Sequence, residues 1–138
     1  MSGEPRERLV GMALLAISEA AVFGVAALLH AGVSLPLGIV EPPLAPAMIV
    51  ETTIALGLAL DAIALFTCSR SAWSLSVGAH AWSVCGVLLG LWAQRDGGGS
   101  NGNRLFHRVM LVVTLGALLW LMSPIGRRTV RRRDTVDA

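Results

Sequence analysis

Four long apolar segments constrain this chain more than any other feature of its sequence. They run over about residues 9–30, 46–67, 72–93 and 105–125. Each is close to the roughly 20 residues that a helix needs to cross the hydrocarbon core of a bilayer. The sequence therefore predicts an all-α fold, a four-transmembrane-helix bundle with antiparallel neighbours, in a single integral membrane domain over residues 1–138.

The overall composition excludes an ordinary soluble domain. Only 14% of the residues are charged and the mean hydropathy is +0.68, whereas soluble domains carry about 25% charged residues. The first apolar segment is longer than the apolar region of a cleaved signal peptide, which spans about 7–15 residues. It also has Glu19 near its centre. We therefore expect it to be retained as a helix.

The arginines predict how the bundle is oriented. All basic residues other than histidine are arginines, and they favour the cytoplasmic side of a membrane. Eight lie in the N-terminal segment, the second connection and the tail 126–138, and three lie around the third connection. Both termini are therefore predicted to be cytoplasmic, in a bacterial plasma membrane. The tail lacks interleaved aromatic residues, so it is interpreted as a topology anchor and not as a nucleic-acid-binding segment.

Ionisable residues interrupt the apolar segments. Each costs roughly 2.5–3.5 kcal/mol at the centre of a membrane helix, so such side chains usually face the bundle interior. Counting the helical rise from each segment end predicts two layers. The inner layer holds Glu19, Asp61 and His80, and the outer layer holds His30, Glu51 and His107.

Matching depths predict specific partners within each layer. Glu19 and His80 both fall near the middle of the membrane, so we expect them to lie close together. Glu51 is expected to point toward His30 or His107. Such residues can act as hydrogen-bonding links between helices or as a functional site, and the sequence leaves both interpretations open.

Two further patterns concern helix packing and the first connection. Gly86 and Gly90 form a GxxxG pattern, which favours close helix packing or dimerisation. The stretch "AGVSLPLGIVEPPLAP" (31–46) contains four prolines and one charge, and is otherwise apolar. It is predicted to be either an interfacial hairpin or a lid over a site.

Few residues suggest chemistry directly. A metal site would use His30, His107 and a carboxylate from Glu41 or Glu51, a nitrogen and oxygen set that suits zinc, iron or copper. A haem would use His30 and His107 as axial ligands. Catalytic residues remain unknown, since the sequence has no recognisable nucleophilic triad, phosphate loop or dinucleotide fingerprint.

The stretch "PAMIVETTIALGLALDAIALFTCSRSAW" resembles the second helix and following turn of DoxX-like four-helix membrane proteins. The matching features are an early acid (Glu51), a Gly in an apolar run (Gly57) and an Arg between small residues (Arg70). The first helix departs from the pattern, because these proteins often follow it with Gly and Lys and this chain has no Lys. The resemblance implies a membrane partner of a redox system, with quinone as a possible cofactor.

Three functional interpretations follow from the sequence. The first is an accessory or scaffold subunit of a membrane complex, including a redox-linked one, working with a membrane protein partner or as a homo-oligomer. The alternative is a small transporter or proton-coupled carrier with an intramembrane relay of Glu19, His80 and Asp61. The third is a metal- or haem-binding membrane protein. An enzyme and a resident cofactor are both less favoured, and no nucleic-acid partner is expected.

Overall fold

The computed structural model describes residues 4–95 and 100–131, and these residues are all-helical apart from their connections. Its elements are α1 (Glu4–His30), a 3-10 turn η1 (Pro36–Gly38), α2 (Ala45–Phe66), α3 (Ala72–Ala93), α4 (Asn101–Met122) and α5 (Pro124–Arg131). The four long helices each contain a segment long and apolar enough to cross a membrane. The prediction of four helices that are long and apolar enough to span a membrane is confirmed.

The observed helix boundaries agree closely with the predicted ones for α2 and α3 and differ from them for α1 and α4. α1 begins at Glu4, five residues before the predicted start, because Pro5 suits a first helical turn where no N–H partner is needed. α4 begins at Asn101, where the Ser100 hydroxyl accepts a hydrogen bond from the backbone N–H of Asn103. α4 ends at Met122, three residues early, because Ser123 is extended, as expected before Pro124.

The sequence did not predict α5, part of which was assigned to the tail 126–138. Gly126 allows α5 to turn tightly off α4, because a Cβ at this position would overlap the backbone carbonyl of Trp120. The guanidinium groups of Arg127 and Arg131 lie 5.0 and 4.1 Å from the ring centroid of Trp73 on α3. These cation–π contacts attach part of the predicted Arg-rich tail to the end of the bundle.

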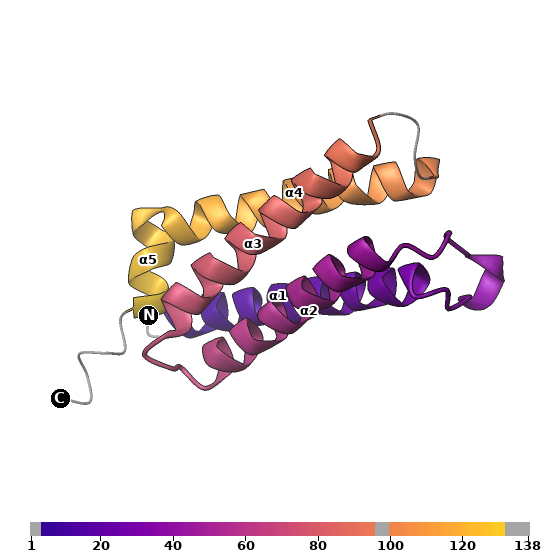
Figure 1. The fold of residues 1–138 in the computed structure, drawn as a ribbon. Helices are drawn as coiled ribbons and strands as arrows, with labels where there is room; N and C mark the ends of the chain where they lie inside the picture. The colour runs from indigo at the N-terminus through magenta and orange to yellow at the C-terminus, as the bar shows by residue number, and fades with distance from the viewer. Residues whose placement is uncertain (1–3, 96–99, 132–138) are drawn as a thin grey trace.

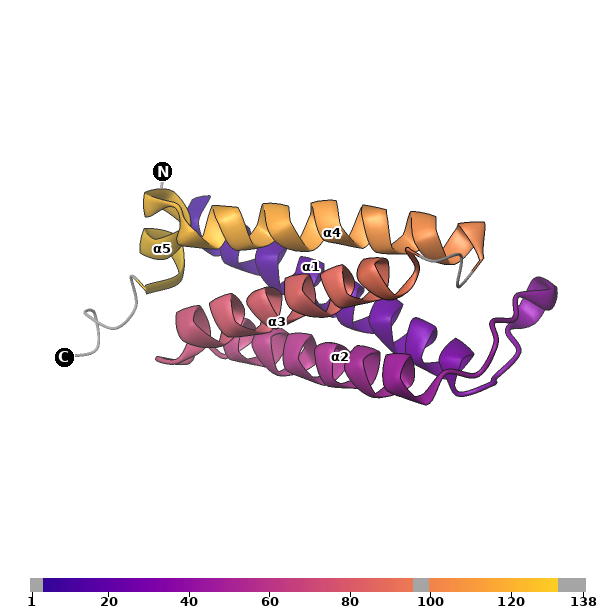
Figure 2. The same cartoon turned by 45° about the horizontal axis from the view of Figure 1, so that its top comes forward.

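The long helices pack in a chain of neighbours. α1 packs most extensively on α2, α2 packs on α3, and α3 packs on α4. Figure 1 shows the N-terminus and α5 at one end of the molecule and the 31–44 connection at the other. In the turned view of Figure 2, α4 lies beside α3 and diverges from α1 toward the end that carries this connection.

Two apolar clusters fill the interior. One is centred on Leu65 and Leu121 near α5, and the other on Phe23, Ile54 and Leu58. Large apolar side chains also cover the outside of every long helix, and Val112 on α4 is 73% exposed. An apolar exterior over all four helices suits contact with lipid and not with water.

Candidate functional site

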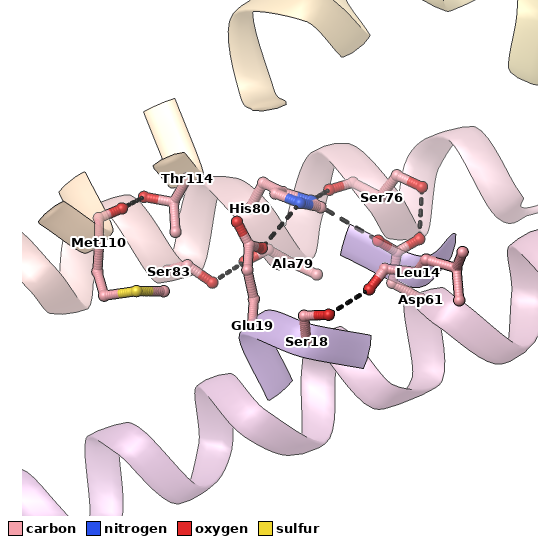
Figure 3. A network of polar contacts seen from close by, with 10 residues as sticks. All are labelled: Leu14, Ser18, Glu19, Asp61, Ser76, Ala79, His80, Ser83, Met110 and Thr114. Atoms are coloured by element: carbon pink, nitrogen blue, oxygen red, sulfur yellow. Dashed lines mark hydrogen bonds and ion pairs between the residues drawn. The ribbon is translucent and has the colours of Figure 1, made fainter. Parts of the chain in front are cut away.

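The inner cluster consists of Glu19, Asp61, Ser76 and His80, contributed by three different helices. Glu19 comes from α1, Asp61 from α2, and the other two from α3, where their spacing of four places them on one face. Figure 3 shows the side chains of Glu19, Asp61 and His80 converging between these helices. Each of the four side chains is at most 2% exposed.

The ring of His80 lies at the centre of this cluster. Its Nε2 is 3.2 Å from Glu19 Oε2, and its Nδ1 is 3.6 Å from Asp61 Oδ2. Nδ1 also lies 2.8 Å from the backbone carbonyl oxygen of Ser76 (Figure 3). The Ser76 hydroxyl donates a hydrogen bond to Asp61 Oδ1. The predicted proximity of Glu19 and His80 is thus confirmed, with Asp61 on the other side of the ring.

These contacts constrain where protons sit on His80. A carbonyl oxygen only accepts hydrogen bonds, so Nδ1 must carry a proton to bond to Ser76. Nε2 faces a carboxyl oxygen of Glu19, and two lone pairs at 3.2 Å would repel each other. A second proton between Nε2 and Glu19 removes this repulsion, whether nitrogen or oxygen carries it. The geometry therefore provides a place for one shared proton.

The inner cluster also has unused hydrogen-bonding capacity. Within the described residues, both Glu19 carboxyl oxygens, Asp61 Oδ2 and His80 Nε2 are buried without an aligned hydrogen bond. Glu19 Oε2 and His80 Nε2 are 3.2 Å apart, which is close enough for an ion pair, but their geometry does not meet the angles of a hydrogen bond. Unsatisfied buried groups are costly, so their presence in one cluster distinguishes it from a simple interhelical hydrogen bond.

The outer layer contains a second acid–histidine contact. His30 at the end of α1 places Nδ1 2.7 Å from Glu51 Oε2 on α2, and both side chains are buried. This confirms one of the two partners predicted for Glu51. His30 and Glu19 are eleven residues apart on α1, or about 16 Å along the helix axis at about 1.5 Å per residue. The outer pair, His30 and Glu51, is therefore separate from the inner cluster.

His107 belongs to a different contact from the one predicted for the outer layer. Its Nδ1 lies 2.9 Å from the carbonyl of Asn103 and 3.2 Å from Gln94 Nε2 on α3. Its Nε2 lies against Gly90, where a Cβ would overlap the ring. Gly90 thus allows close packing of α3 against α4, and Gly86, the other glycine of the GxxxG pattern, allows close packing of α3 against Val50 and Ile54 of α2.

This placement does not fit the metal and haem hypotheses. No group of three His, Cys, Asp or Glu residues within 4–95 and 100–131 is arranged to hold a metal ion. His30 and Glu51 pair with each other, and Glu41 accepts a hydrogen bond from Ser100. His107 directs Nε2 at Gly90 and not toward a partner histidine. An axial pair of His30 and His107 is therefore not formed.

Some contacts were not found by sequence reasoning. The contact of Gln94 with His107 was not predicted, because Gln94 directly follows α3 and lies outside the predicted segment 72–93. The contact of Glu41 with Ser100 ties the 31–44 connection to the start of α4. Nothing in the local sequence indicates this link, because its members are 59 residues apart.

Comparisons with known proteins found no matching family model, curated protein or solved structure. The arguments about function therefore rest on the geometry of this chain.

Proposed function

We propose that this chain is a small proton-coupled membrane carrier whose proton-binding site is the Glu19–His80 pair. The observation that carries the proposal is the contact of a buried carboxyl group with a buried imidazole at 3.2 Å, inside helices suited to cross a membrane. Intramembrane Asp, Glu and His side chains commonly mark proton and substrate pathways. Asp61, on the other side of His80, is the second acid of the relay.

The inner cluster joins three helices, so a change in its protonation would change how these helices pack. Glu19, Asp61 and His80 belong to α1, α2 and α3, so adding or removing the shared proton changes the attraction between all three helices. A carrier needs two states whose stability differs with protonation. In this proposal the protonated pair holds α1 against α3, and the deprotonated pair loosens that contact.

The proton-binding role predicts an infrared signal from Glu19. We expect pH-difference infrared spectra of the purified protein in lipid to contain a protonated-carboxyl band that disappears in Glu19→Gln. The exposed acid Glu7 lies on the same helix, so Glu7→Gln is the matched control and is expected to retain the band. A difference spectrum that is identical in the wild type and Glu19→Gln would contradict the proposal.

The second candidate is an accessory subunit of a membrane complex, including a redox-linked one. It is favoured by the small extent of the described chain outside the four long helices, which is limited to short connections and α5. Under this proposal the protein elutes from mild detergent together with a larger membrane partner, and Glu19→Gln leaves its association unchanged. A carrier, in contrast, is functional alone or as a homo-oligomer.

We further propose antiparallel long helices in a bacterial plasma membrane, with both termini in the cytoplasm. The arginine asymmetry supports this orientation, and Arg70 marks the same side at the α2–α3 turn. In a Cys85→Ser background, a membrane-impermeant maleimide should label Ser34→Cys in intact cells. Cys68, next to Arg70, should react only after permeabilisation. Labelling of Cys68 but not of Ser34→Cys in intact cells would reverse the orientation.

A further inference from the structure

An apolar groove of about 430 Å³ lies between α1 and α4, under the 31–44 connection. Its walls include Ala21, Val22 and Val25 of α1, Ile39 of the connection and Phe106 of α4. The volume falls within the range of roughly 300–1,000 Å³ typical of small-molecule sites. Val22, Val25 and Ile39 are each at least 40% exposed, so the groove opens sideways, where the helices would meet lipid.

The polar groups of the groove gather at one end of it. His30, Glu41 and Asn103 line this end, whereas the remaining walls are apolar except for Gly102 backbone. His30 is 6% exposed and its Nδ1 is occupied by Glu51, so Nε2 is the ring nitrogen left for the groove. Among residues 4–95 and 100–131, this Nε2 has no hydrogen bond. An imidazole nitrogen with no protein partner, at the end of an otherwise apolar groove, provides one polar contact for a ligand that is apolar elsewhere.

The chemistry of this end selects the ligand head. When Nδ1 donates to Glu51 and the His30 ring carries this one proton only, Nε2 presents an acceptor lone pair. Glu41 is a carboxylate, which also accepts, and one of its oxygens is engaged by Ser100. Two acceptors favour a ligand that donates a hydrogen bond. The carboxylate of Glu41 at this end disfavours an anionic head, because like charges repel at short range.

We infer that the α1–α4 groove binds a neutral membrane lipid with a free hydroxyl group, of the diacylglycerol class. One acyl chain would lie along α1 and Phe106, and the hydroxyl would donate to His30 Nε2. The 31–44 connection, tied to α4 by the Glu41–Ser100 contact, closes the end of the groove over the lipid head. This inference rests on the groove and is independent of the proton site at Glu19.

The inference is tested by native mass spectrometry of the protein from vesicles that contain equal amounts of three lipids. These are a diacylglycerol, a triacylglycerol without a hydroxyl, and a phosphatidate with an anionic head. We expect the diacylglycerol adduct to be at least several-fold more abundant than the other two. Equal retention of triacylglycerol would show that the hydroxyl is not recognised, and a preference for phosphatidate would show an anion site instead. Either result would overturn the inference.

Two variants separate this groove from general lipid adhesion. Ala21→Phe fills the groove without touching His30 or Glu51 and is expected to reduce the diacylglycerol adduct severalfold. Leu28→Phe is the matched control, because Leu28 is an exposed α1 residue facing the separate furrow between α1 and α2. Unchanged diacylglycerol binding in Ala21→Phe, or an equal loss in both variants, would contradict binding in this groove.

Discussion

Replacing Glu19 with leucine is expected to destabilise the protein by about 3–5 kcal/mol, the cost typical of removing one partner of a buried ion pair. The change leaves the Nε2 of His80 facing an apolar side chain at a site where His80 is fully buried. His80→Leu should have an effect of similar size, because it leaves Glu19 and Asp61 together without the ring between them.

The double variant Glu19→Leu/His80→Leu should be less destabilised than the sum of the single changes. Removing both partners of the Glu19–His80 contact leaves neither of them unpaired, whereas each single change leaves the other partner buried alone. Thermal unfolding in detergent measures all three variants, and Glu7→Leu, at an exposed position of α1, controls for the loss of a carboxylate. Effects of Glu19→Leu and His80→Leu that simply add would show that the two residues do not interact.

The second large effect is expected at Gly90 in the contact between α3 and α4. A Cβ here would overlap the ring of His107, whose Nδ1 lies 2.9 Å from the Asn103 carbonyl oxygen and 3.2 Å from Gln94 Nε2. Gly90→Ala should therefore cost about 1–3 kcal/mol, as is typical of overpacking a tightly fitted interior. Gly78→Ala on the same helix should instead stabilise by up to about 1 kcal/mol, because nothing lies near its added methyl group.

A compensating variant identifies His107 as the cause of this cost. Gly90→Ala/His107→Ala removes the ring that the new methyl group meets, so it should be no less stable than His107→Ala alone. Thermal unfolding of the single and double variants measures this. A Gly90→Ala protein as stable as the wild type would show that α3 and α4 do not pack as described.

The four spanning helices could be predicted because their signal is local and strong. Each is a continuous apolar run, and backbone polar groups in lipid must be satisfied within the helix itself. The break at Ser123 and the α5 helix depend instead on Pro124, on the close approach of Gly126 to Trp120, and on long-range stacking with Trp73. The periodicity of the sequence does not predict any of these tertiary contacts.

The acid–histidine pairs could be predicted from depth and helix face together, because the helical rise fixes the height of each residue and the helical period fixes its side of the helix. Depth did not settle which histidine Glu51 would meet. His30 and His107 lie at similar heights, and packing of His107 against Gly90 decides between them. Depth also could not show that Asp61 reaches the other side of the His80 ring, because that requires the relative rotation of α2 and α3.

The most direct test of the account is a through-space nuclear magnetic resonance measurement on the labelled protein in lipid bilayers. It would detect transfer between the ring nitrogens of His80 and the side-chain carboxyl carbons of nearby acids. We expect His80 Nε2 to correlate with the Glu19 carboxyl carbon and Nδ1 to carry a proton, with the His30–Glu51 correlation as an internal control. If the His30–Glu51 correlation is present and the His80–Glu19 correlation is absent, the two residues are not in contact and the proposed proton site is wrong.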